Sequence, residues 1–207
     1  MQLAHRRRTG AFRGDARDRS LGAVLVEAAF VTPLFLLLVF GIIEVGLAMN
    51  DRLALAHAVR AGTRVASASG NDRLADYGII KTVMAEAAAL GDDQIEMVIV
   101  YRADGIGDPP PDRCLEGRSA RPTTKTDDAC NVYLPEDFGV KKDKWGCKDE
   151  EDLDEFWCPM SREVVRSQGP EYVGVYMKVS HRWVTGMFGQ TVTLTDQSVI
   201  RLEPRAR

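Results

Sequence analysis

The strongest constraint on the fold is an apolar run of 27 residues from Ala23 to Met49. As an α-helix, with a rise of about 1.5 Å per residue, this run would be roughly 40 Å long, whereas the apolar interior of a bilayer is about 30 Å thick. A run of this length and composition can therefore cross a membrane. The sequence predicts one transmembrane helix at 23–49.

Charges on the two sides of this run are unequal. Residues 1–22 contain six arginines and two aspartates, a net charge of +4, which leaves −7 for the rest of the chain. Because basic residues beside a membrane helix favour the cytoplasmic side, we expect 1–22 to be a basic cytoplasmic leader. The chain would cross the cytoplasmic (inner) membrane once, with its C-terminal domain extracytoplasmic. No dense stripe of Lys and Arg remains in that domain, so nucleic acid is not expected as a partner.

Two glutamates flank the charge-free centre of the run. Glu27 and Glu44 stand on either side of residues 28–43, a stretch that as a helix would be only about 24 Å long. Both carboxylates cannot lie well clear of the hydrocarbon, so at least one is expected to have a polar partner. The alternative is that both side chains reach the polar interfaces at opposite ends of the helix.

A cleaved secretory signal is a second interpretation of the apolar run. Gly46, Leu47 and Ala48 form a small-x-small pattern that a signal peptidase would accept. The run is too long for the apolar region of such a signal and contains two glutamates. We therefore favour a permanent membrane helix.

The junction between the basic segment and the apolar run has a characteristic spacing. Gly22 is followed by four small or apolar residues and then by Glu27. This spacing resembles the type IV prepilin leader, which a prepilin peptidase cuts after the glycine, here leaving Ala23 as the new N-terminus. Glycine offers the peptidase an unobstructed backbone. The glutamate, one helical turn away, can pair with the new amine or with that of a neighbouring subunit.

Further motifs narrow this resemblance. EAAFVTP at 27–33, GIIEVG at 41–46 and RAGTRVA at 60–66 together resemble the TadE-like minor pilins, or pseudopilins, of the tight-adherence (Flp) type IV pilus system. Two departures are Ala28, where the family more often has an aromatic residue, and a long cysteine-bearing insertion. The resemblance implies a structural or assembly component of a pilus or related secretion apparatus. Its implied partners are the prepilin peptidase, other pilin or pseudopilin subunits and membrane lipid.

The exported part is predicted to be α+β. The apolar periodicity of the first helix continues to about Ser69, and a second helix is expected at about 73–90. Strand patterns follow, so that 50–103 would hold helices and a first strand and 171–207 a C-terminal β-hairpin. This gives a small antiparallel sheet of about three strands. In its last strand Val192 and Leu194 differ in parity from Val199, which suggests a bulge near residues 196–198.

Small residues form a stripe along the exported half of the first helix. Such a stripe allows close approach, either to helices of other subunits or to the chain's own sheet. The pattern favours neither use. Its members are Leu55, Ala58, Val59, Gly62, Val65, Ala66 and Ser69.

Residues 104–170 are predicted to form an irregular loop insertion that contains all four cysteines, Cys114, Cys130, Cys147 and Cys158. A segment with little apolar periodicity needs covalent support, and an oxidising compartment outside the cytoplasm would let these cysteines pair. Two disulfides are expected, with three connectivities open. A zinc site is the alternative, but the spacing contains no C-x-x-C pair.

Carboxylates crowd the run Asp149–Glu155 within this insertion. The run could bind calcium, yet it lacks the alternating ligand and glycine pattern of an EF-hand loop. We expect a solvated acidic face there.

No catalytic constellation is evident, so neither catalytic residues nor a cofactor or metal is predicted. His5, His57 and His181 stand outside any recognisable catalytic or metal-binding motif. His181 alternates with Val179 and Trp183, as a packed strand residue would. The sequence therefore predicts a non-enzymatic protein. The alternative to a pilin is a signal-anchored extracytoplasmic binding module that is not part of a pilus.

Overall fold

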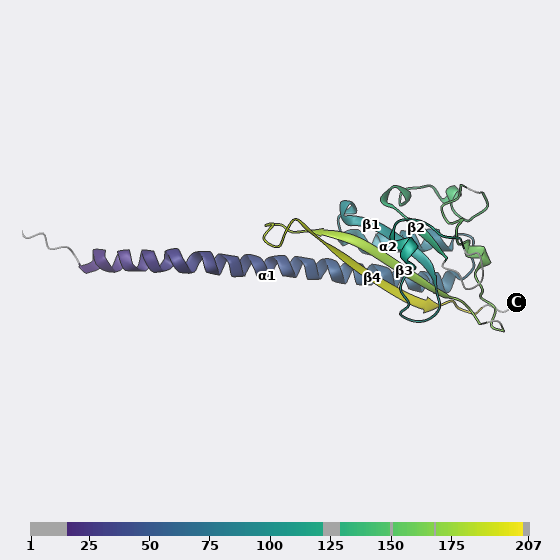
Figure 1. Cartoon of the computed structure of the whole chain (residues 1–207), viewed down its shortest axis with the longest axis horizontal. Helices are drawn as coiled ribbons and strands as arrows, with labels where there is room; N and C mark the ends of the chain where they lie inside the picture. Colours follow the sequence, from purple (N-terminus) through teal and green to yellow (C-terminus); the bar gives the residue numbers. More distant parts are fainter. Residues whose placement is uncertain (1–15, 122–128, 150, 168, 205–207) are drawn as a thin grey trace, which may run out of the picture. The chain divides into compact units, whose positions relative to one another are not determined.

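The computed structural model describes residues 16–121, 129–149, 151–167 and 169–204. Residues 1–15 of the expected leader lie outside this part. The chain divides into two compact units, 1–43 and 44–207. One helix, α1 (Ala16–Ser69), contributes to both units (Figure 1).

The described part of the first unit is helical and apolar. Its large apolar side chains are exposed, among them Phe30 at 78% and Leu34 at 70%. Within the described residues, α1 is the one helix long and apolar enough to cross a membrane. Such a surface requires apolar surroundings, which is compatible with the predicted single-pass anchor.

The second unit is α+β, as predicted. The remainder of α1 and a second helix, α2 (Ala75–Glu86), pack against an antiparallel sheet of order β2-β1-β3-β4. The strands are β1 (Ile95–Ala103), β2 (Cys130–Tyr133), β3 (Tyr172–Arg182) and β4 (Thr191–Arg201). A short helix, α3 (Asp112–Leu115), precedes β2, and 3-10 turns lie at Ala87–Ala89, Asp92–Gln94, Pro135–Asp137, Lys142–Lys144 and Pro159–Ser161.

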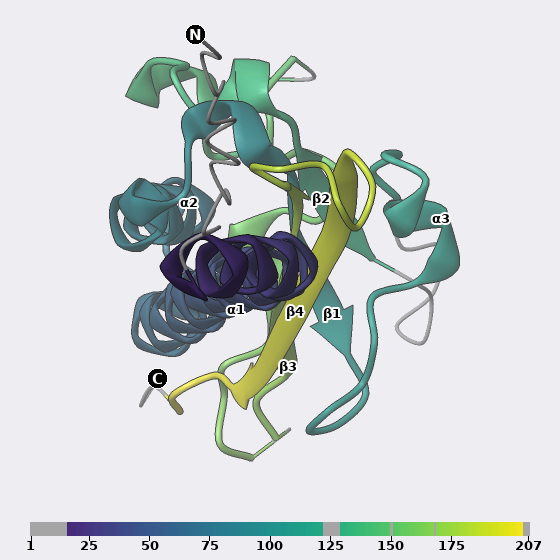
Figure 2. The same ribbon diagram turned by 90° about the vertical axis from the view of Figure 1, so that its left-hand side faces the viewer.

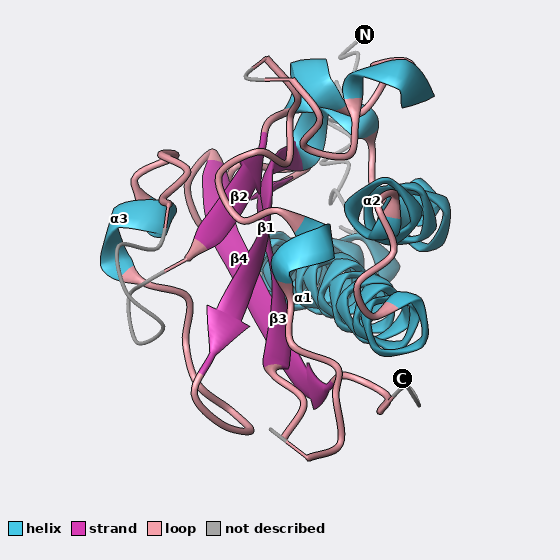
Figure 3. Ribbon diagram, turned by 90° about the vertical axis from the view of Figure 1, so that its right-hand side faces the viewer, coloured by secondary structure: helices cyan, strands magenta, loops and turns pink. Residues whose placement is uncertain are grey.

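Both faces of the sheet are covered. Figures 2 and 3 show α1 and α2 on one face and α3 on the other. Alternation along β3 places Val173, Val175, Met177 and Val179 in the larger cluster beneath the two helices. The opposite face carries a smaller cluster around Tyr101, covered by residues of the insertion. The insertion is therefore part of the fold rather than an appendage.

The sheet differs from the expectation in two details. It has four strands rather than about three, because β2 comes from the predicted loop insertion and pairs with β1. The expected bulge near residues 196–198 is wrong, since the β3–β4 register is unbroken from Tyr172↔Arg201 to Arg182↔Thr191. Leu194 packs in the larger cluster and Val199 in the smaller one, so their different parity reflects two apolar faces.

The small-residue stripe of α1 is used within the chain. Leu55, Ala58, Val59 and Ala66 are fully buried in the larger cluster. At Gly62 an added Cβ would lie 2.5 Å from Cγ2 of Val83, so this position must be small for α1 to approach α2. α1 ends at Ser69, as predicted.

Candidate functional site

The predicted processing segment lies near the start of the described part of α1. Gly22, Ala23 and Glu27 are helical and exposed. A Cβ built on Gly22 would meet nothing within 4 Å, so the glycine is not required for packing. A peptidase needs extended backbone and would have to unwind this turn, which glycine makes easier than alanine by about 1 kcal/mol.

Glu44, the second predicted membrane carboxylate, is 1% exposed. Its carboxylate accepts hydrogen bonds from the backbone N–H groups of Val184, at 3.0 Å, and Thr185. Both donors belong to the loop between β3 and β4. Glu44 therefore has the polar partner that was expected for at least one of the two glutamates.

A second contact holds the same hairpin to α1. Asp51, seven residues after Glu44 and so on the same face of the helix, lies 2.6 Å from Nδ1 of His181. The His181 side chain is 4% exposed, and its ring makes an edge contact with Trp183 at 4.9 Å. His181 is thus a packed strand residue, as predicted. We refer to Glu44, Asp51 and His181 as the hairpin latch.

All four predicted cysteines form disulfides. Cys114 of α3 pairs with Cys130 of β2, with Cα atoms 6.4 Å apart. Cys147 pairs with Cys158, with Cα atoms 5.5 Å apart. Of the three connectivities that the sequence leaves open, the structure has the one joining sequential neighbours.

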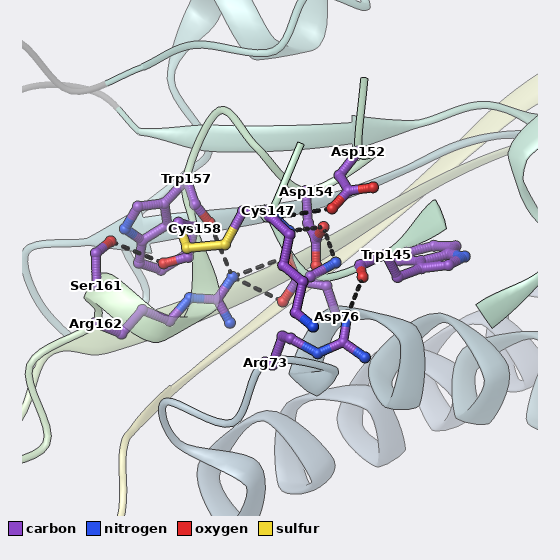
Figure 4. Close-up of a disulfide and its surroundings, with 12 residues drawn as sticks. Arg73, Asp76, Trp145, Cys147, Asp152, Asp154, Trp157, Cys158, Ser161 and Arg162 are labelled. Carbon is purple, nitrogen blue, oxygen red and sulfur yellow. Dashed lines mark hydrogen bonds and ion pairs between the residues drawn. A yellow bond between two sulfur atoms is a disulfide. The ribbon is translucent and has the colours of Figure 1, made fainter. Parts of the chain in front are cut away.

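A buried polar network fixes the insertion to α2 (Figure 4). Asp76, in the first turn of α2, forms an ion pair with Arg162 at 2.7 Å, and both side chains are fully buried. Asp76 also accepts hydrogen bonds of 2.8 Å from Asn131 and Tyr133. The Arg162 guanidinium lies over the ring of Trp157, 4.1 Å from its centroid. We call these five residues the Asp76 network.

The expected solvated acidic face is wrong for two of its carboxylates. Asp152 is 4% exposed and accepts the N–H groups of Lys148 and Asp149 at 2.8 and 3.3 Å. Asp154 is fully buried and accepts those of Gly146 and Cys147. These carboxylates order the loop that carries the second disulfide. Among the described residues, no group of His, Cys, Asp or Glu could hold a metal ion.

Asp154 should make stability depend on pH. Burial, and then the nearby Asp76 carboxylate, raise the pKa of Asp154 from 3.8 to about 6. The folded protein therefore binds this proton more tightly than the unfolded chain. The resulting stabilisation, at most about 3 kcal/mol, is complete below pH 3.8 and lost as the pH rises through 6.

Asp154→Asn is expected to remove this pH-dependent stabilisation. The amide oxygen of the asparagine can still accept hydrogen bonds from the two N–H groups. Urea unfolding of the chain in detergent, followed by tryptophan fluorescence from pH 4 to 7, measures it. The stability of the wild type relative to the variant should fall across this range. The exposed Asp149→Asn should leave the wild-type dependence unchanged, and an equal slope in Asp154→Asn would contradict the assignment.

The Asp76 network does not follow from the sequence patterns. A signal for Asp76 was present, because it lies three and four residues before Ile79 and Ile80 on the buried face of α2. Its partners lie 55 to 86 residues away in sequence, beyond the reach of a periodicity argument. The network is closed to solvent, so its geometry serves packing.

An apolar N-terminal helix that continues into an α+β unit is compatible with a protein held by a single membrane anchor. Comparison with family models identifies part of it more closely: residues 22–64 match the family described as TadE-like protein. This match confirms the resemblance seen in the sequence and is consistent with a TadE-like protein of the Tad pilus system. It covers 43 of the 207 residues, all within α1. Comparisons with curated proteins and with solved structures gave no match.

Proposed function

We propose that this chain is a TadE-like minor pilin or pseudopilin, a non-catalytic structural or assembly component of a tight-adherence (Flp) pilus or related secretion apparatus. The observation that carries this proposal is the position of the family match. It begins at Gly22, the residue after which a prepilin peptidase would cut, and runs through the apolar helix into the second unit.

Processing would convert an anchored precursor into an assembly-competent subunit. Removal of residues 1–22 takes away the leader, whose net charge is +4, and leaves an ammonium group on Ala23. Glu27 is exposed on the helix and can accept charge from this amine or from that of a neighbouring subunit. Exposed apolar side chains between Val24 and Ile43 would contact lipid first and other pilin helices later.

The second unit supports an exported, structural role. Both disulfides lie in it, and disulfides persist in oxidising compartments outside the cytoplasm. The buried ionisable groups Asp76 and Arg162 are paired with each other rather than directed into a cleft. The basic leader favours a cytoplasmic N-terminus, with the sheet and insertion on the outside.

Deleting this chain from the cell that makes it is expected to abolish or sharply reduce surface pili, counted by electron microscopy. The wild-type chain should restore them, whereas Glu27→Gln should restore them poorly because the membrane carboxylate no longer pairs with an amine. Glu86→Gln alters an exposed glutamate at the end of α2 and is the matched control. Normal pili in the deletion strain would contradict the proposed function.

A further inference from the structure

The loop joining β3 and β4, residues 183–190, is an uncharged apolar protrusion that we call the hairpin tip. Val184 is 75% exposed, Met187 40% and Phe188 54%. The Trp183 ring lies 5.4 Å from that of Phe188. No charged residue occurs between Arg182 and Asp196. Hairpin loops in water are usually polar, so this composition requires a different contact.

The hairpin latch fixes the position of the hairpin tip along α1. Hydrogen bonds to Val184 and Thr185 place the tip beside Glu44, and Figure 1 shows the loop between β3 and β4 alongside α1. The apolar run continues beyond this point to Met49, which is 56% exposed and is followed by the polar residues Asn50, Asp51 and Arg52. Met49 lies five residues after Glu44, about 7.5 Å along the helix axis. The tip is thus beside the apolar run of α1, roughly 7.5 Å before that run ends at Met49.

The position of the hairpin tip along α1 corresponds to the level of a membrane interface. A hydrocarbon layer of about 30 Å that begins after Glu27 would accommodate about 20 helical residues and end near Leu47. Segments that lie in the interface reach about 5–10 Å into the boundary between headgroups and acyl chains. Tryptophan is enriched at this level, where an apolar ring with one polar N–H is favoured. Trp183 supplies such a ring, and the exposed apolar side chains of the hairpin tip lie within this range of the expected boundary.

The backbone of the hairpin tip is also suited to low polarity. In a membrane, irregular backbone is tolerated only when its N–H and C=O groups are hydrogen-bonded. The Glu44 carboxylate accepts two N–H groups of the tip, and Glu44 is 1% exposed. Further N–H groups are bonded within the tip: Trp183 to the Gln190 carbonyl, Gly189 to the Gly186 carbonyl and Met187 to the Thr185 hydroxyl.

We propose that the hairpin tip inserts into the outer interface of the bilayer, so that the protein contacts lipid through the tip as well as through α1. The partner is a lipid surface, because the tip is uncharged and is bonded to α1 at Glu44, within the apolar run. This inference rests on the membrane anchoring in the proposed function but does not require leader cleavage or pilus assembly. A second lipid contact would hold the exported unit against the membrane while the subunit awaits extraction.

Tryptophan quenching in the full-length chain tests this proposal. The chain is reconstituted into phosphatidylcholine vesicles with or without doxyl-labelled acyl chains, and floated protein is taken for fluorescence. The other two tryptophans, Trp145 and Trp157, are buried, at 1% and 2% exposed. The difference in fluorescence between the wild type and Trp183→Phe therefore gives the signal of Trp183. We expect doxyl lipid to quench this signal. Aqueous iodide should quench it several-fold less than a tryptophan at an exposed control position.

Ile106 provides that control. It is 83% exposed and follows the end of β1 at Ala103, which pairs with Tyr172 at the opposite end of β3 from the hairpin tip. Ile106→Trp in the Trp183→Phe background should be quenched by iodide and unaffected by doxyl lipid. The same response from Trp183 in floated protein would overturn the inference while leaving the anchor intact.

Two other outcomes also count against the inference. Shielding of Trp183 from iodide without doxyl quenching would mean that protein, such as a second copy of the chain, covers the hairpin tip. Failure of the chain to float would overturn both the membrane anchor and the tip contact. Failure of leader cleavage, measured separately, would count against the pilin function alone.

Discussion

Replacing Arg162 by methionine is expected to lower the free energy of unfolding of the second unit by about 3–5 kcal/mol. The Arg162 and Asp76 side chains are both fully buried and form an ion pair at 2.7 Å. Without the guanidinium, the carboxylate would remain buried beside Asn131 and Tyr133 with no opposite charge. Urea unfolding in detergent, followed by tryptophan fluorescence, measures this loss.

Two further variants show whether the loss comes from the buried charge. The pair Asp76→Asn and Arg162→Met leaves neither charge in the core, so it should recover part of the stability lost in Arg162→Met. Arg121→Met removes an ion pair with Glu155 in the same unit; the Arg121 side chain is 58% exposed, so the loss should cost about 1 kcal/mol. A cost for Arg162→Met as small as that for Arg121→Met would show that the Asp76 network does not hold the insertion.

Gly22→Leu is expected to abolish removal of the leader. A branched side chain at this position would obstruct the backbone that the peptidase must bind, and the exposed Gly22 has no packing role that this change would disturb. Intact mass of the chain, produced beside a prepilin peptidase, reports the loss of residues 1–22. The uncut mass should persist in the variant.

Gly46→Leu is the matched control for this substitution. Gly46 is another glycine of α1 with nothing within 4 Å of an added Cβ, but it lies outside the predicted leader. This variant should be processed like the wild type. Continued cleavage at the same bond in Gly22→Leu would contradict the prepilin assignment.

Helical parts of the fold were predictable because their signals are long and local. The apolar run and the stripe continuing to Ser69 together extend over many helical turns, so the main course of α1 follows from periodicity. Alternation in β3 likewise identifies its buried face. By contrast, β2 has four residues, too few to show a period, and its place depends on pairing with β1. The sequence of the insertion therefore shows no strand pattern and predicts an irregular loop.

The features that the sequence did not predict depend on contacts between residues far apart in the chain. The short apolar stretch between Glu27 and Glu44 indicates that one carboxylate needs a partner. It cannot indicate which one, or that the donors are backbone N–H groups 140 and 141 residues away. The density of acidic residues at 149–155 suggests solvation, yet Asp152 and Asp154 are buried because nearby backbone N–H groups bind them.

N-terminal sequencing of the mature protein tests the central claim most directly. The wild-type chain, produced beside a prepilin peptidase and recovered from the membrane, is expected to begin at Ala23, with Glu27 as its fifth residue. An intact Met1 under these conditions, or a start at Met49 as expected for a secretory signal cut after Ala48, would contradict the account.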